Sequence, residues 1–340
     1  GPVRTGVTVV VPHEGNLFRE KVPAAVFAFN GYGKAIGLVQ IQETGTLESP
    51  IAVTGTLNVA RVADALMSWI LENNPDVGLG AGTANPVVTE IHDGFLNDAR
   101  GRHVREEHLR QALASAAPGP VQEGAVGAGT GAVAFGWKGG VGTASRLLPP
   151  ERGGWCVGSL VVTNFDGALT IAGLPVGPLM GRLPRPARPR PSSDGGSVIV
   201  VLATDAPLGS RNLARLARRA VLGLARTGFY GGNTSGDFVI AFTTAYRVPH
   251  GGGDLPSGAP LVEAPVQLVR NDAMGPLFLA AVEATEEAVL NALFKATTVA
   301  GRDGHVAEAL DLDRLRQVLR ANRWMAPGTP GQEAPWYEAR

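Results

Sequence analysis

The sequence predicts one α/β domain in which buried strands alternate with amphipathic helices. Apolar residues make up 44 % of the 340 residues and charged residues only 18 %, which is typical of a chain with a large core. Apolar side chains recur with a period of two in some stretches and with helical spacing in others. The 46 Gly and 25 Pro indicate many turns between short elements. We therefore predict a single domain over 1–340.

Charge and composition exclude several classes of partner. Lys plus Arg and Asp plus Glu both number 30, so the chain has no general attraction for nucleic acid or anionic lipid, and we predict neither as a partner. No apolar run approaches the roughly 18 residues of a membrane span. The single cysteine excludes an internal disulfide. The first residues lack a signal-peptide pattern, which predicts a cytoplasmic protein. A periplasmic location stays open, because natural residues before Gly1 can be missing.

The first hundred residues change from strand to helix. Alternating valines predict a strand over 7–11, and a second extended segment follows over 25–29. Helical spacing then appears over 59–70 and again over 104–116. The turn-rich segment between these helices holds Glu90, His92 and Asp93 as conceivable metal ligands. Because the spacing of no known metal motif is present, we predict no metal site.

Residues 123–145 form the longest glycine-rich segment, and two nucleotide-binding patterns are almost present in it. Thr143 stands where a P-loop needs its lysine, and the dinucleotide-like glycines of 127–131 are followed by a strand-like stretch instead of a helix. We therefore predict no cofactor. The glycines would instead let the backbone closely approach another segment or a substrate.

The second half continues the alternation. The expected elements are strands over 157–164, 168–172, 197–203, 238–242 and 266–269, and helices over 213–224, 276–299 and 310–319. Residues 178–195 are rich in proline and arginine, which predicts a mobile surface loop, although an acidic partner would also fit. The arginines on the 213–224 helix are expected to form a solvated face.

Ser235 is the candidate nucleophile. A run of small and turn-forming residues, 231–234, delivers this serine to the start of an apolar strand. A sharp turn can hold the Thr234–Ser235 peptide in a strained geometry that favours chemistry there. A glycine-rich hairpin ending in a serine explains the same local pattern, so the local sequence leaves both interpretations open.

Several segments, in matching order, resemble the self-processing L-aminopeptidase/D-esterase (DmpA-like) and β-peptidyl aminopeptidase family. The segments that carry this resemblance are 1–8, 89–98, 123–145, 161–165, 203–208, 235–237 and 284–288. The resemblance implies a four-layer α/β/β/α sandwich and self-cleavage of the Thr234–Ser235 bond. Two chains, 1–234 and 235–340, would then stay associated, and the family implies a homo-oligomer, a homotetramer.

The resemblance also implies roles for individual residues. The expected catalytic set is Ser235, Thr285, Glu287 and Asn164, and the expected substrate-binding set is Glu123, Phe135 and Gly129. Thr285 and Glu287 fit a hydroxyl-and-glutamate motif that assists the serine, and because two such residues in one regular helix would point apart, we expect a helix start or break near Thr285. Asn164 and glycine-segment amides would stabilise an oxyanion.

Glu123, ranked ahead of Glu90, would bind a substrate ammonium. Phe135 stands where the family pattern leads us to expect a tyrosine, so one hydroxyl donor is lost. The implied function is an aminopeptidase that acts on short peptides, amides or esters. A self-processing acyltransferase of related fold is an alternative, against which Ser235 argues. A third is a non-catalytic binding protein that uses the arginine-rich segment.

Overall fold

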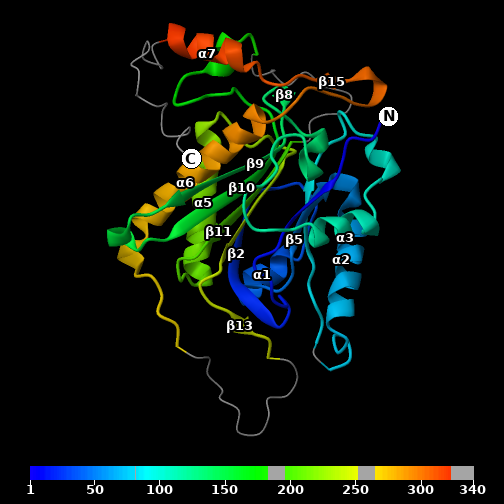
Figure 1. Ribbon diagram of the computed structural model, residues 1–340, viewed down its shortest axis with the longest axis vertical. Coiled ribbons are helices and arrows are strands. Elements are labelled where there is room, and N and C mark those ends of the chain that lie inside the picture. The colour runs from blue at the N-terminus through cyan, green and yellow to red at the C-terminus, as the bar shows by residue number, and fades with distance from the viewer. Residues whose placement is uncertain (81, 183–195, 252–264, 323–340) are drawn as a thin grey trace.

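The protein has four layers, with two β-sheets stacked face to face and helices covering both outer faces (Figure 1). The computed structural model describes residues 1–80, 82–182, 196–251 and 265–322. Helices α5 (Ser210–Arg226) and α6 (Gly275–Phe294) pack on the larger sheet. Helices α2 (Val59–Asn73) and α3 (Glu106–Ala114) cover the smaller one. This is the α/β/β/α sandwich that the sequence resemblance implies.

The larger sheet has the strand order β13-β2-β12-β11-β10-β9, with β4 also paired to β2. Its strands are β2 (Glu20–Gly31), β4 (Thr46–Leu47), β9 (Val141–Leu147), β10 (Cys156–Asn164), β11 (Ser197–Thr204), β12 (Gly236–Thr243) and β13 (Val248–Pro249). β11 and β12 run parallel, and α5 supplies the crossover that parallel neighbours need. β12 therefore lies inside the sheet, between β11 and β2.

The smaller sheet has the order β1-β5-β6-β3, formed by β1 (Val7–Val10), β5 (Ile51–Gly55), β6 (Val87–Ile91) and β3 (Ala35–Ile36). The shorter elements are α1 (Leu38–Thr44), α4 (Val176–Leu179), α7 (Leu312–Ala321), β7 (Val133–Ala134), β8 (Trp137–Lys138), β14 (Val299–Ala300), β15 (Val306–Ala307) and the 3-10 turns Thr56–Asn58, Ala99–Gly101, Gly127–Gly131, Pro150–Arg152, Asn271–Ala273 and Arg302–Gly304. Within the described ranges, no helix has both the length and the hydropathy needed to cross a bilayer.

Both faces of β12 are covered, and all eight of its residues are buried. Phe238 and Ile240 belong to the core between the two sheets, whereas Val239 and Ala241 belong to the core beneath α5 and α6. Side chains alternate between the faces of a strand, so a strand covered on both sides needs apolar residues at every position. This explains the unbroken apolar run over 238–242.

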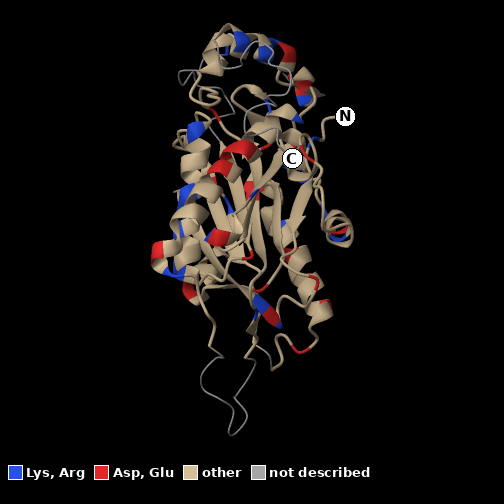
Figure 2. Ribbon diagram, turned by 60° about the vertical axis from the view of Figure 1, so that its left-hand side comes forward, with Lys and Arg blue, Asp and Glu red and all other residues tan. Residues whose placement is uncertain are grey.

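The arginines of α5 attach that helix to α6. The guanidinium of Arg219 lies 4.2 Å from the centre of the Phe278 ring, and that of Arg215 lies 5.0 Å from the same ring. Arg226 pairs with Glu286 at 3.1 Å. Figure 2 shows basic and acidic residues interspersed over the outer helices. The expected solvated arginine face is present only in part: Arg211 and Arg218 are exposed, whereas Arg215 and Arg219 are half-buried against α6.

Three expected elements differ from the structure. Residues 168–172 do not form the strand of a hairpin: Ile171 makes an isolated bridge to Leu174, and Gly167, just before the segment, bridges to Phe229. Residues 266–269 are irregular, although the Val269 amide donates to Pro207. α6 is one continuous helix that passes through Thr285 without a break and ends at Phe294. In the 178–195 loop, 183–195 lie outside the described residues.

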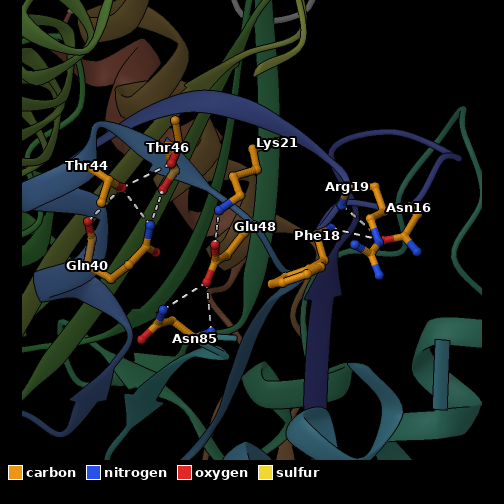
Figure 3. Close-up of polar contacts among 9 residues, drawn as sticks. All are labelled: Asn16, Phe18, Arg19, Lys21, Gln40, Thr44, Thr46, Glu48 and Asn85. Carbon is orange, nitrogen blue, oxygen red and sulfur yellow. Dashed lines mark hydrogen bonds and ion pairs between the residues drawn. The ribbon is translucent and has the colours of Figure 1, made fainter. Parts of the chain in front are cut away.

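A polar network fixes the start of β2, at the opposite end of that strand from Gly31 (Figure 3). Lys21 forms an ion pair with the buried Glu48. Glu48 also accepts hydrogen bonds from the backbone and side-chain amides of Asn85, at 2.9 and 2.8 Å. Both oxygens of the buried Glu48 carboxylate thus have partners, and these contacts hold the start of β2 in place. At the other end of the strand, Gly31 lies opposite Gly236.

Candidate active site

Ser235 lies immediately before β12, at the end of a tight turn. Gly231 has φ 69°, in the left-handed region that glycine tolerates, which lets the chain reverse after α5. The turn is held by Asn30, whose Nδ2 donates to the Gly232 carbonyl at 2.5 Å, and by the Ser235 amide, which donates to the same carbonyl at 3.0 Å. Ser235 is only 1 % exposed. Its hydroxyl is therefore closed to solvent in the continuous chain.

Asp237 is the partner of the Ser235 hydroxyl. Ser235 Oγ donates a hydrogen bond of 2.6 Å to Asp237 Oδ1. Burial raises the pKa of Asp237 to about 6, against the opposing effect of hydrogen bonds from Ser235 and the Val198 backbone. Sequence reasoning missed Asp237, although the signal was present: residues two apart at the start of a strand project to the same side.

Glycines let three backbone segments meet around Ser235. A Cβ on Gly196 would lie 2.9 Å from Ser235 Oγ and 3.5 Å from the Asn164 carbonyl oxygen. A Cβ on Gly236 would lie 2.5 Å from the Gly33 Cα and 3.1 Å from Glu90 Oε1. The absence of side chains at these positions thus brings the segment after β2, the residue before β11 and Glu90 of β6 close to the serine.

Asn164 occupies the same end of the sheet as Ser235. It pairs with Ser197, which in turn pairs with Gly236 in β12. Its Nδ2 donates to the His92 carbonyl at 2.9 Å, and its Oδ1 accepts from the Val133 amide at 2.9 Å. The side chain of Asn164 therefore ties the glycine-rich segment to the loop after β6, next to the candidate nucleophile.

Lys138 organises the glycine-rich segment from inside. Its ammonium donates to the carbonyls of Gly129 and Ala132, each at 2.8 Å, and to that of Gly139 at 2.7 Å. Burial lowers the pKa of Lys138 to about 7, while three carbonyl acceptors match the three donors of the charged form. Gly129 must be glycine, because a Cβ there would lie 2.6 Å from the Val141 amide nitrogen.

Phe135 is buried in an aromatic cluster. Its φ of 53° is unusual for a residue with a side chain, and its amide donates to the Phe165 carbonyl at 2.9 Å. The Phe135 and Phe165 rings meet edge to face at 5.0 Å, and Phe165 meets Phe229 in the same way. Phe229 lies just upstream of the serine turn, so this cluster links the glycine-rich segment to that turn.

The two glutamates weighed for ammonium binding lie in different places. Glu123 Oε1 accepts hydrogen bonds from the Thr143 amide and hydroxyl, at 2.6 and 2.8 Å, beside β9, the last strand of the larger sheet. Glu90 is buried next to Gly236, where its Oε2 accepts from the Thr56 hydroxyl and lies 3.6 Å from Lys34 Nζ. Of the two, Glu90 is adjacent to the Ser235 segment.

Thr285 and Glu287 are not brought to Ser235. Thr285 Oγ1 lies 3.3 Å from Ser159 Oγ, and Glu287 pairs with Arg146 at 2.6 Å. Ser159 precedes Asn164 by five residues of β10, about 16 Å at the usual rise per residue. The two residues therefore stabilise the packing of α6 on β9 and β10 in this structure.

A cavity of about 1080 Å³ opens elsewhere, beside β1, the end of α2 and residues 112–122. Ser235, Asp237 and Asn164 do not line it. Across the part of the chain that the structure describes, no three His, Cys, Asp or Glu side chains gather as metal ligands would. The polar chemistry next to the candidate nucleophile thus comes from Asp237, Glu90 and Asn164.

Known proteins resemble this chain in sequence and in fold. Residues 1–307 match Peptidase family S58. Beta-peptidyl aminopeptidase BapA of Sphingosinicella microcystinivorans is 40% identical over 339 residues, which cover 96% of this chain and 82% of that protein. Two solved structures are also similar. A Burkholderia sp. beta-aminopeptidase has a TM-score of 0.85 and 41% identity, and covers 95% of this chain and 88% of its own.

The other is the L-aminopeptidase D-Ala-esterase/amidase of Ochrobactrum anthropi, described as a variant of the Ntn (N-terminal nucleophile) hydrolase fold. It has a TM-score of 0.83 and 39% identity, and the match covers 95% of this chain and 87% of that one. The sequence match and the likeness of fold extend over nearly the whole chain. The chain therefore belongs to peptidase family S58 and is an aminopeptidase with the N-terminal-nucleophile hydrolase fold.

Proposed function

We propose that the chain cleaves its own Thr234–Ser235 bond, and that Ser235, once N-terminal, is the nucleophile that releases N-terminal residues from short peptides, amides or esters. The observation that carries this proposal is the 2.6 Å hydrogen bond from Ser235 Oγ to a buried carboxylate, directly after a tight turn. Buried ionisable groups with raised pKa values are concentrated at sites of chemistry.

Cleavage at this bond would create the nucleophile and its base together. The new α-amine would lie on the same residue as the hydroxyl, and its ordinary pKa is about 7.7–8.0. A useful fraction is therefore unprotonated near neutral pH and can accept the hydroxyl proton during peptide hydrolysis. Residues 1–234 and 235–340 would form the two chains of the processed enzyme.

The surrounding residues have corresponding roles in the proposal. Asn164 positions the glycine-rich segment, whose backbone around Gly129 would face the substrate. Phe135 would supply an apolar side chain beside the substrate, at the position where a tyrosine hydroxyl would otherwise donate a hydrogen bond. Glu123 is the sequence-predicted partner of the substrate ammonium; both its Thr143 contacts use one oxygen, Oε1. Thr285 and Glu287 have no role in the proposal, because they contact β10 and β9 at a distance from Ser235.

The substrate class follows from the relatives. Because two of the similar proteins are named for action on β-peptides or as beta-aminopeptidases, we extend the proposed substrates to short peptides that begin with a β-amino acid. A homotetramer of processed chains is the assembly that we propose with it, since the sequence resemblance implies one.

The decisive experiment compares wild-type protein with Ser235→Ala. On a denaturing gel with intact-mass analysis, we expect the wild type to give fragments 1–234 and 235–340 and the variant to give one chain. Only the wild type should release p-nitroaniline from α- or β-aminoacyl p-nitroanilides. A wild-type protein that stays in one piece and releases no amine would refute the proposal.

A further inference from the structure

The base that serves peptide hydrolysis does not exist before self-cleavage. In the continuous chain the nitrogen of Ser235 belongs to a peptide bond, and its N–H donates to the Gly232 carbonyl. An amide nitrogen has no basic lone pair, so the hydroxyl needs another proton acceptor for the first cut. The hydrogen bond of Ser235 Oγ runs to Asp237 Oδ1.

Asp237 has the contacts of a reactive group more than those of a structural one. It is 1 % exposed and accepts hydrogen bonds from the Ser235 hydroxyl and the Val198 backbone, but its second oxygen, Oδ2, is buried and within hydrogen-bond geometry of no donor among the described residues. Burying a carboxylate is unfavourable unless its oxygens are satisfied. By contrast, Glu90, the nearby acid on β6, is engaged by the Thr56 hydroxyl and by Lys34. Asp237 therefore has an oxygen with unused hydrogen-bonding capacity in the precursor.

We propose that Asp237 is a catalytic residue of self-cleavage, accepting the proton of Ser235 Oγ as that oxygen attacks the Thr234 carbonyl carbon. The inference rests on the proposed function, because it assigns the base for that cut. Once the α-amine of Ser235 exists, the amine takes over as base for substrates, and Asp237 then orients the hydroxyl through the same hydrogen bond.

The step balances without a further reactant except water. The Asp237 carboxylate takes the hydroxyl proton, and Oγ forms a bond to the Thr234 carbonyl carbon. The C–N bond to Ser235 then breaks, and the leaving nitrogen receives the proton from Asp237. An ester between the Thr234 acyl group and Ser235 Oγ remains. Water hydrolyses this ester, which gives the Thr234 carboxylate and returns a proton to Oγ.

The test follows self-cleavage of newly translated full-length chain over time on denaturing gels. We expect Asp237→Asn, which keeps the size of the side chain and one acceptor oxygen, to slow the cut by about 10²-fold or more, the usual contribution of a general base. The matched control is Asp205→Asn, because Asp205 Oδ1 accepts the Cys156 amide, which lies at the end of β10 opposite Asn164. This control should cut at the wild-type rate.

Two further measurements separate the outcomes. The wild-type cleavage rate should fall as the pH is lowered through about 6, because protonated Asp237 accepts no proton. This profile decides the matter if Asp237→Asn fails to fold. Hydroxylamine, which cleaves esters, should release no extra fragment from Asp237→Asn, since its defect precedes the ester.

An Asp237→Asn chain that cuts at the wild-type rate, or that accumulates a hydroxylamine-sensitive ester, would overturn the assignment while leaving the proposed function intact. A pH-independent wild-type rate between 5 and 8 would do the same. A wild-type chain that never cuts would instead remove the proposed function itself, so the two failures are distinguishable.

Discussion

Gly196 determines how closely the backbone of the strand beside β12 approaches the candidate nucleophile. A Cβ at this position would lie 2.9 Å from Ser235 Oγ and 3.4 Å from Ser235 Cβ, closer to the oxygen than real Cβ atoms come. We expect Gly196→Ala to displace the hydroxyl and to slow self-cleavage by about 10²-fold, since small misplacements of reacting groups have effects of that order. The gel time course measures this rate.

Gly158→Ala is the matched control for that substitution. Gly158 lies in β10 of the same sheet, and a Cβ there would lie 3.9 Å from the Ala203 carbonyl oxygen, at ordinary contact distance. This variant should cut normally. If Gly196→Ala also cut at the wild-type rate, the close contact with Ser235 would have no role in placing the hydroxyl.

The sequence predicts Ser235 as the candidate nucleophile, but it does not predict all of the residues that lie beside it. The small residues of 231–234 and the apolar strand after them are local features, so this position could be read directly. Asp237 was equally local, but an acid at the start of an apolar strand was treated as part of the motif and given no role. The place of Thr285 depends on how α6 crosses β10, a tertiary contact that no local pattern contains.

Lys138 is the buried support of the glycine-rich segment, whose backbone carbonyls accept all three of its assigned hydrogen bonds. We expect Lys138→Met to lower the free energy of unfolding by about 1–3 kcal/mol, because the Gly139 carbonyl loses its donor, whereas the Gly129 and Ala132 carbonyls keep the amides of Ala132 and Gly139. Methionine keeps most of the aliphatic part of the lysine side chain, so the loss of stability measures the contribution of the ammonium group. Urea unfolding in a Ser235→Ala background measures it on a continuous chain.

The exposed Lys295 supplies the comparison, since Lys295→Met should leave the urea midpoint almost unchanged. Equal midpoints for Lys138→Met and its parent would show that the segment keeps its shape without the ammonium.

The elements themselves were predicted well wherever one period of apolar residues continued for a full strand or helix. The prediction was wrong where two alternatives had the same local pattern. Residues 168–172 look like the return strand of a hairpin, but Gly167 bridges to Phe229 instead, which brings the segment to the end of α5. The expected break in α6 was inferred from side-chain roles, whereas residues 276–294 are helix-forming and simply remain helical.

The proposed cut divides the molecule next to an interior strand, which predicts how the two pieces behave. β12 and α6 would belong to 235–340, while β11, β2 and α5, which contact them, would belong to 1–234. We expect the fragments to elute together in size-exclusion chromatography without denaturant and to separate only in urea. Separate elution under native conditions would contradict this, because β12 is buried along all of its eight residues.

The parallel pairing of β11 with β12 also means that the processed protein depends on having folded as one continuous chain. Two parallel neighbours meet only after a crossover such as α5 has folded back across the sheet, and in one chain that meeting is an intramolecular event. After the cut, if the two fragments separate, this pairing can form again only by association of two molecules, at a rate that depends on their concentration. The native arrangement would therefore be assembled once, before processing, and afterwards be protected mainly by how slowly it comes apart.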